Sequence, residues 1–194
     1  MNIRKATKDD IPVMADTLSR AFHHDPIVDW VFRDEPSRPK YTRRFFGGRA
    51  RVLIDQREIY IADDAAVAMW ARPDEWRDPP LQAMKELGIL APGVGRRVFQ
   101  VMRGLVQVEA RHPKPPHWYL AVLGTEPDRQ GEGLATALLH KVLDECDRDE
   151  VPAYLETGTE RNVAFYTRHG FKVREELQLP KGRPVWLMWR EPRL

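Results

Sequence analysis

The chain has 194 residues, 42% of them hydrophobic and 31% charged, which predicts a single folded domain over residues 1–194. Its 31 basic and 29 acidic residues leave a net charge of +2, too small to hold nucleic acid or an anionic membrane through an overall field. The lone cysteine, Cys146, excludes an intramolecular disulfide and a multi-thiolate metal site. The first residues lack the apolar stretch of a secretory signal, and no run of about 18 apolar residues occurs. We therefore expect a cytoplasmic protein, as a monomer or a homodimer.

The first half of the chain mixes strand-like segments with segments of helical periodicity. Apolar residues spaced three or four apart predict helices, and runs of β-branched and aromatic residues predict strands. Asp63 and Asp64 lie between two such runs and predict a hairpin turn. In chain order the expected elements are a strand over residues 2–6, a helix over about 9–22, an apolar segment over 27–32, a helix from about residue 40, and antiparallel strands over 58–62 and 65–71.

The second half predicts further strands and helices in alternation. Apolar residues recur at every fourth position from Leu134 to Cys146, which is typical of an amphipathic helix. Thr157 and Glu160 have the spacing of a capping box, and Gly170 is suited to ending the helix that they open. The expected elements are helices near 80–88 and 92–111, a strand over 117–123, a helix from about 134, a strand over 152–156, a helix from 157 to 170, and strands over 171–179 and 185–189.

A glycine loop over residues 130–135 is the most informative stretch, because it lies where a strand turns into a helix. Glycines let a backbone approach a ligand closely, and the free N–H groups of a first helical turn suit a phosphate. An ordinary connecting loop is the competing interpretation. Two other phosphate loops are excluded: no Lys-Ser or Lys-Thr follows the glycines, and Thr136 stands where a dinucleotide fingerprint needs its third glycine.

The loop residues Gln130, Gly133 and Ala135 match the Q/R-x-x-G-x-G/A acyl-CoA signature of the GNAT superfamily of N-acetyltransferases, which the chain resembles. The order of segments is most similar to the branch containing puromycin N-acetyltransferase. The resemblance implies an α/β GNAT (acyl-CoA N-acyltransferase) fold, in which helices flank a mixed central sheet of about seven strands. Further residues that carry the similarity lie at 155–157, 161–166, 170–171 and 180–190.

The resemblance also implies acetyl-CoA as the acetyl-donor cosubstrate, in a V-shaped gap between the strand ending near Leu123 and the strand ending near Glu156. Backbone groups at the end of the first strand would pair with the pantetheine arm, and loop N–H groups would hold the pyrophosphate. Asn162 would hydrogen-bond the pantetheine, and Arg129 either contacts a phosphate or is a solvated loop residue. The predicted cofactor-binding residues are Leu123, Gly124, Thr125, Arg129, Gln130, Gly131, Glu132, Gly133, Leu134, Ala135, Asn162 and Tyr166.

Two residues are predicted to carry the chemistry. Tyr166 matches the position from which relatives protonate the departing CoA thiolate, and a core tyrosine is the alternative. Glu156, at the end of its strand, is the candidate for accepting the proton of the amine, and a strand-end glutamate bound by backbone donors is the competing interpretation. Asp25 and Asp29 could instead attract a cationic amine or be ordinary helix-cap and surface acids.

Several other signals have simpler explanations. His23 and His24 are adjacent, lack a spaced partner, and so predict no metal site. Cys146 lies on the apolar stripe of its helix, which favours a buried thiol over a nucleophile. The basic segment 38–51 resembles a nucleic-acid surface but is explained by a helix with a solvated cationic face. Core packing competes with an acceptor-pocket interpretation for three tryptophans, namely Trp30, Trp70 and Trp118.

The sequence thus predicts an acetyltransferase that transfers an acetyl group from acetyl-CoA to a primary amine by direct attack in a ternary complex. The expected partner is a small-molecule amine, for example an aminonucleoside or another antibiotic, with no nucleic acid and no membrane involved. One alternative is a non-catalytic acyl-CoA sensor, and another is an enzyme acting on a protein amine.

Overall fold

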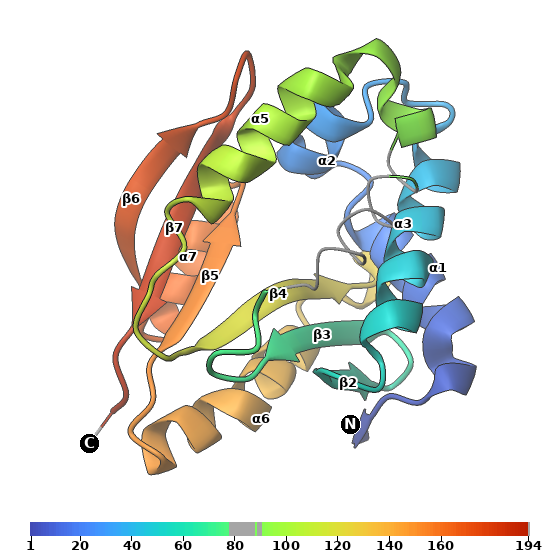
Figure 1. Ribbon diagram of the computed structural model, residues 1–194. Helices are drawn as coiled ribbons and strands as arrows, with labels where there is room; N and C mark the ends of the chain where they lie inside the picture. Colours follow the sequence, from blue (N-terminus) through green and yellow to red (C-terminus); the bar gives the residue numbers. More distant parts are fainter. Residues whose placement is uncertain (78–87, 89–90, 194) are drawn as a thin grey trace.

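The computed structural model describes residues 1–77, 88 and 91–193, whose strands form one seven-stranded sheet in the order β1-β2-β3-β4-β5-β7-β6 (Figure 1). The strands are β1 (Ile3–Lys5), β2 (Glu58–Ala62), β3 (Ala66–Ala71), β4 (Trp118–Thr125), β5 (Ala153–Thr157), β6 (Lys172–Gln178) and β7 (Pro184–Arg190). The helices are α1 (Ile11–Ala21), α2 (Pro26–Val31), α3 (Arg38–Leu53), α5 (Val98–Glu109), α6 (Leu134–Arg148) and α7 (Glu160–Arg168), with 3-10 turns at Lys8–Asp10, Gly95–Arg97 and Pro127–Arg129. This mixed sheet with flanking helices confirms the predicted fold class.

The centre of the sheet parts where β4 meets β5. All other neighbouring strands pair antiparallel, but β4 and β5 run parallel and pair only from Trp118 to Leu120. Beyond Leu120, β4 stays with β3 as far as Thr125, and β5 stays with β7 as far as Thr157. The two strands diverge in Figure 1 as a consequence. We call the place where they part the β4–β5 fork.

A bulge in β4 lies directly at this fork. Met69 of β3 pairs with Val122 and Trp70 pairs with Leu120, which leaves Ala121 as the extra residue. A bulge bends its strand and interrupts the alternation of side chains between the two faces. Leu120 accordingly packs in the core beneath α6, whereas Val122 packs in the core beneath α1 and α3. The outer half of β4 is therefore redirected where it leaves β5.

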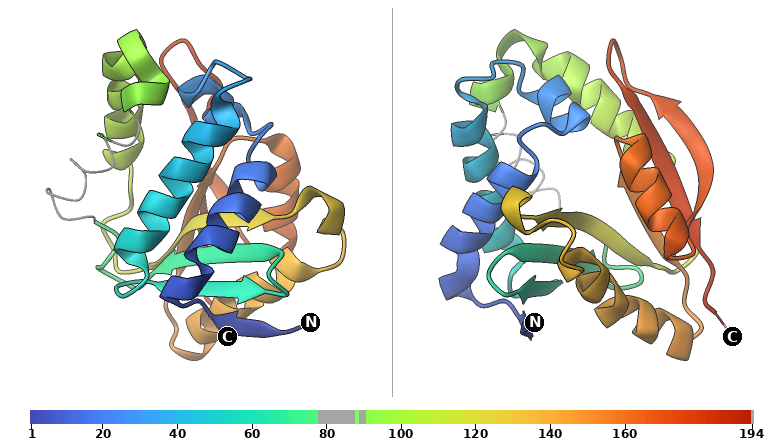
Figure 2. Two further views of the ribbon diagram at one scale, coloured as in Figure 1. Left: turned by 90° about the vertical axis from the view of Figure 1, so that its right-hand side faces the viewer. Right: turned by 180° about the vertical axis from the view of Figure 1, so that it is seen from behind.

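Helices cover both faces of the sheet. Leu138, Val142 and Cys146 of α6 and Tyr166 of α7 share one apolar cluster with residues of β2 to β5. The opposite face is covered by α1 and α3 over β2 to β4, and by α2 and α5 over β5 to β7, as the two views of Figure 2 show. None of the described helices is long and apolar enough to cross a membrane.

The structure corrects one sequence-based expectation and gives another segment its secondary structure. The α7 helix is capped by Thr159, whose hydroxyl accepts the N–H of Asn162 at 3.1 Å, and not by Thr157. Thr157 is instead the last residue of β5, where pairing with Trp186 of β7 holds it extended. The apolar segment at 27–32 forms the short helix α2. The predicted helix near 80–88 lies outside the described residues except for Gly88.

A buried ion pair joins the ends of α6, α7 and β7. The Arg190 side chain is 2% exposed, and its two terminal nitrogens donate to the Asp147 carboxylate at 2.7 and 2.6 Å. Arg190 Nε also donates to the carbonyl of His169 at the end of α7. The guanidinium holds the pKa of Asp147 below its usual range. This contact fixes the two helices that flank the β4–β5 fork against one strand.

We expect Asp147→Asn to lower the free energy of unfolding by about 3 kcal/mol, because it leaves the buried Arg190 charge without its partner. Asp149→Asn, which removes the exposed pair with Arg148, should cost less than about 1 kcal/mol. Since the pKa of Asp147 is depressed in the fold, its ionic contribution is complete above the unfolded pKa of about 3.9 and is lost as the pH falls below it. Urea unfolding of both variants between neutral and acidic pH measures these effects, and equal losses in the two would contradict the assignment.

Candidate active site

The glycine loop enters α6 through two residues in the left-handed region. Gly131 has φ of 90° and Gly133 has φ of 84°, a conformation that other residues rarely adopt. Gly133 is the N-cap of α6 and offers no side chain to its first-turn N–H groups. The residues from Gln130 to Gly133 are exposed. Exposed N–H groups at the positive end of a helix dipole are a suitable cradle for a pyrophosphate.

Two arginines flank this cradle. Arg129 is bound to Glu132 of the loop, with Nε 2.7 Å from Oε2, and lies 3.9 Å from Asp63. Arg161, in the first turn of α7, donates to Gln130 Oε1 at 3.3 Å and so brings α7 to the loop. Sequence reasoning assigned no role to Arg161, although it directly precedes Asn162. The predicted phosphate contact of Arg129 would require it to exchange Glu132 for the ligand.

The end of β4 packs against α1 at Gly124 and ends in a polar residue, Thr125. A Cβ at Gly124 would lie 2.8 Å from Leu18 of α1 and 3.0 Å from Phe22, so this glycine lets α1 close onto the strand. The hydroxyl of Thr125 is buried and has no hydrogen-bond partner among the described residues. Leu134 is 2% exposed in the core, so only its backbone can face a ligand. These features fit coenzyme A. The glycine loop and the two flanking arginines suit its phosphates, and the unpartnered Thr125 hydroxyl at the end of β4 suits its pantetheine.

Tyr166 and Asn162 lie four residues apart on α7, and therefore on the same helix face. The Tyr166 side chain is 7% exposed and packs edge-on against Phe165 and Phe171. Burial, and next the charge of Asp25, raise the pKa of the Tyr166 hydroxyl well above its usual range. The hydroxyl is consequently protonated at neutral pH and can act as a proton donor.

Glu156 is the first residue of β5 beyond the part paired with β4, and it projects from the sheet face opposite Tyr166. Because side chains alternate along a strand, Glu156 shares its face with Tyr154, whereas Leu155 packs with Tyr166. Tyr119 donates its hydroxyl to Glu156 Oε2 at 2.8 Å. Only 13% of the Glu156 side chain is exposed. Among the described residues, the hydrogen bond to this carboxylate thus comes from a side chain and not from the backbone donors of the competing interpretation.

A histidine that sequence reasoning missed also faces Glu156. His112 follows α5, its Nδ1 lies 3.6 Å from Glu156 Oε1, and its side chain is 3% exposed. The ring stacks on Trp76, with the two centroids 3.5 Å apart. The sequence contained one signal of this contact, namely a second histidine five residues later, before the strand that supplies Tyr119. Forty-four positions separate His112 from Glu156, however, and no local pattern joins them.

The structure gives Asp25 and Asp29 the simpler of their two roles. Asp25 caps α2 by accepting the N–H groups of Ile27 and Val28 at 2.8 and 3.1 Å. Burial raises the pKa of Asp25, while these two N–H groups act in the opposite direction. Asp29 pairs with the guanidinium of the buried Arg38. Neither aspartate is therefore available to attract an amine without giving up a structural contact.

The remaining candidates are core residues. The three tryptophans named above are 4%, 0% and 7% exposed, in chain order, which supports core packing over an acceptor pocket. Trp30 in addition donates its indole N–H to the carbonyl of Pro180. Cys146 is fully buried, and burial raises its pKa to about 12, so the thiol is not a nucleophile at neutral pH. In the described part of the chain, no three His, Cys, Asp or Glu side chains gather as a metal site requires.

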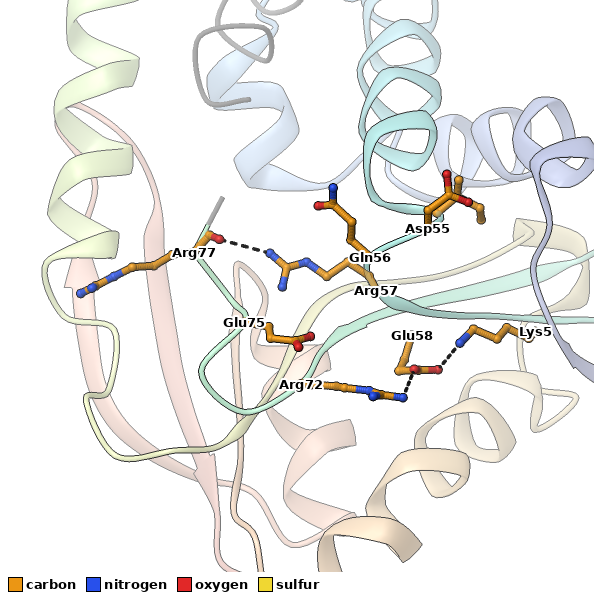
Figure 3. A pocket seen from close by; sticks show the side chains of 9 residues that line it. Lys5, Asp55, Gln56, Arg57, Glu58, Arg72, Glu75 and Arg77 are labelled. Atoms are coloured by element: carbon orange, nitrogen blue, oxygen red, sulfur yellow. Dashed lines mark hydrogen bonds and ion pairs between the residues drawn. The ribbon is translucent and has the colours of Figure 1, made fainter. Parts of the chain in front are cut away.

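A hollow of about 620 Å³ lies at the far end of β2 and β3 from the glycine loop (Figure 3). Its charged side chains largely neutralise one another. Glu58 binds both Lys5, at 2.8 Å, and Arg72, at 2.6 Å. Antiparallel pairing places the end of β3 beside the start of β4, whereas the loop follows the end of β4. This hollow is therefore separate from the cofactor cradle.

A central sheet that parts beside a glycine-capped helix defines an acyltransferase that takes its acyl group from coenzyme A. Comparison with known proteins supports this class: a model of the acetyltransferase (GNAT) family matches residues 61–171. This match spans more than half of the chain, and the chain belongs to that family of acyl-CoA-dependent enzymes.

Similar proteins agree with the assignment. An uncharacterized N-acetyltransferase of Schizosaccharomyces pombe is 23% identical over 99% of this chain and 84% of its own length. A Corynebacterium glutamicum structure described as histone acetyltransferase HPA2 and related acetyltransferase is 25% identical, with a TM-score of 0.71 over 100% of this chain and 97% of that one. Arylalkylamine N-acetyltransferase 2 of Aedes aegypti shares the fold, with a TM-score of 0.63, 11% identity and 99% coverage of both chains.

Proposed function

We propose that the protein transfers the acetyl group of acetyl-CoA to a primary amine of a small molecule, by direct attack within a ternary complex. The observation that carries this proposal is the β4–β5 fork, which has a buried tyrosine on one face and a carboxylate on the other. Tyr166 lies on the α6 side and Glu156 on the α5 side. The proposal places the thioester in the fork, between these two side chains.

The glycine loop is proposed to hold the donor. Backbone N–H groups from Gln130 to Ala135 would bind the pyrophosphate, with Arg129 or Arg161 adding a charge-assisted contact. The β4 end, from Leu123 to Thr125, would pair with the pantetheine through backbone groups, and the Thr125 hydroxyl would gain a partner. Asn162, on the same face of α7 as Tyr166, would direct the pantetheine toward the fork. Bound in this way, acetyl-CoA supplies an activated acetyl group.

The two side chains divide the proton transfers between them. The amine nitrogen forms a bond to the thioester carbonyl carbon, and the carbon–sulfur bond then breaks. Glu156 accepts the proton that the amine gives up, and Tyr166 donates a proton to the departing thiolate. Protons and electrons balance, because an amide and a free thiol are formed from an amine and a thioester.

The acceptor is proposed to be a drug-sized amine such as an aminonucleoside. This finer assignment is supported by the resemblance of the segment order and motifs to the branch containing puromycin N-acetyltransferase. The enclosed position of Glu156, between Tyr119 and His112, also favours a small acceptor over a protein chain. An open acidic groove would favour a protein amine instead.

A thiol-release assay with acetyl-CoA tests the proposal on a panel of amines that includes puromycin, simple arylalkylamines and a lysine-containing peptide. We expect turnover on at least one small amine, together with saturable acetyl-CoA binding in calorimetry. Acetyl-CoA binding without turnover on any amine would support a sensor and contradict the proposed reaction. Turnover confined to the peptide would contradict the proposed acceptor class.

A further inference from the structure

A row of polar groups, joined by one ion-pair contact and two hydrogen bonds, leads from Glu156 to a surface loop. His112 Nδ1 faces Glu156 Oε1 at 3.6 Å, and His112 Nε2 lies 2.9 Å from His117 Nε2. His117 Nδ1 lies 2.6 Å from the carbonyl oxygen of Pro115. Pro115 is exposed, whereas His117 is 1% exposed. Each group in the row therefore constrains where its neighbour can carry a proton.

The row fixes the protons on both rings. A carbonyl oxygen only accepts hydrogen bonds, so the Nδ1 of His117 carries a proton. A neutral His117 then has a lone pair on Nε2, and the proton between the two rings belongs to His112 Nε2. If His112 were neutral as well, its Nδ1 would direct a lone pair at the Glu156 carboxylate. Two acceptors would then face each other in a buried place.

One additional proton removes this conflict, and the surroundings indicate where it resides. Burial lowers the pKa of His117, which therefore stays neutral, although the Pro115 carbonyl acts in the opposite direction. Among the residues that the structure describes, the other charged and titratable groups that act on this region are Tyr119, Tyr154, Asp74 and Arg174. Tyr119 donates to the other carboxylate oxygen and so favours the ionised form of Glu156. The additional proton then belongs on His112 Nδ1.

We propose that His112 is a positioning residue, which holds one proton against Glu156 Oε1 and thereby keeps this carboxylate ionised and directed at the fork. The inference deepens the proposed function and rests on it, because Glu156 is there the acceptor of the amine proton. With His112 on one oxygen and Tyr119 on the other, Glu156 has a fixed orientation. A carboxylate held in this way is ready to take a proton when an amine arrives.

The first test needs no activity. The protein is labelled with ¹⁵N-histidine, and the resonances of His112 are assigned from their loss in His112→Asn. At about pH 7 we expect His112 to carry protons on both ring nitrogens and His117 to carry one, on Nδ1. In Glu156→Gln the side-chain amide can donate to His112, so His112 should become neutral. A wild-type His112 with a single proton would overturn the proposal.

The second test uses two substitutions that each retain one side of the histidine ring. An asparagine amide lies close to the position of Nδ1 and can still donate to Glu156, whereas a glutamine amide reaches the position of Nε2 and contacts only His117. We expect kcat of His112→Gln to fall about 10-fold or more, within the range that acid–base catalysis contributes. His112→Asn should retain more of the activity. His140→Asn, on the exposed face of α6, is the control and should match the wild type.

The pH profile separates positioning from a loss of packing. Without the imidazolium the carboxylate is protonated more readily, so the acidic limb of kcat should move to higher pH in His112→Gln. Both variants should bind acetyl-CoA within about twofold of the wild type, since His112 lies away from the glycine loop. If the acidic limb of the kcat–pH profile stays at the wild-type pH in a folded His112→Gln protein, the positioning role is refuted. If no amine is turned over at all, the ¹⁵N measurement still decides the protonation of His112 independently of the proposed function.

Discussion

Replacing Tyr166 with phenylalanine is expected to lower kcat by about 100-fold or more, the range typical of general acid catalysis. The affinity for acetyl-CoA should change by less than about twofold. Only the hydroxyl is removed, and the phenylalanine ring can keep the packing against Phe165 and Phe171. Because burial raises the pKa of this hydroxyl, it is protonated throughout the neutral range. Without it, the thiolate would have to leave unprotonated.

A matched tyrosine provides the control for this prediction. Tyr60 belongs to the same apolar cluster, is 9% exposed, and donates its hydroxyl to Glu58 at 3.1 Å, at the end of the sheet away from the glycine loop. Tyr60→Phe should therefore remove a buried phenol without slowing the reaction. Steady-state kinetics with saturating acetyl-CoA, paired with calorimetric binding, separate the two variants. Equal rates for Tyr166→Phe and the wild type would remove Tyr166 from the acid role.

The glycine loop could be predicted from sequence because its requirement is local. A backbone with positive φ at Gly131 and Gly133 favours glycine at both positions, and the signature specifies the second of them, Gly133. The same holds for Asn162 and Tyr166, whose separation of four residues sets their common helix face before any tertiary structure is known. Strand and helix order followed from periodicity in the same way.

What the sequence could not predict depends on pairing between distant segments. Thr157 has the spacing of a helix cap, but β7 extends β5 through this residue, so Thr159 takes that role. From the sequence, Trp70 and Trp118 could have faced either a pocket or the core. In the fold, α6 packs over both, and they therefore lie in the core. His112 reaches Glu156 because the chain after α5 returns to the start of β4. Such contacts have no counterpart in local periodicity.

Gly133→Val is expected to weaken acetyl-CoA binding by about 10-fold or more. A β-branched residue is strongly disfavoured at φ of 84°, so the cap must move and its N–H groups lose their direction. Each hydrogen bond to a charged group contributes about 1.5–3 kcal/mol, and the loss of one accounts for a change of this size. Calorimetric titration with coenzyme A itself measures the effect without any acceptor.

The control variant Gly95→Val tests whether backbone strain alone, at a glycine outside the cofactor cradle, lowers the affinity for coenzyme A. Gly95 has φ of 59° at the turn before α5, and a Cβ there would meet no atom of the described structure within 4 Å. Its substitution should cost a similar free energy of unfolding, about 1–2 kcal/mol, because both sites hold a left-handed backbone in open space. Only the Gly133 variant should lose coenzyme A affinity, since only its N–H groups belong to the α6 N-terminus. Equal binding by both variants and the wild type would show that the pyrophosphate is held elsewhere, whereas equal weakening would show that global destabilisation suffices to explain the loss.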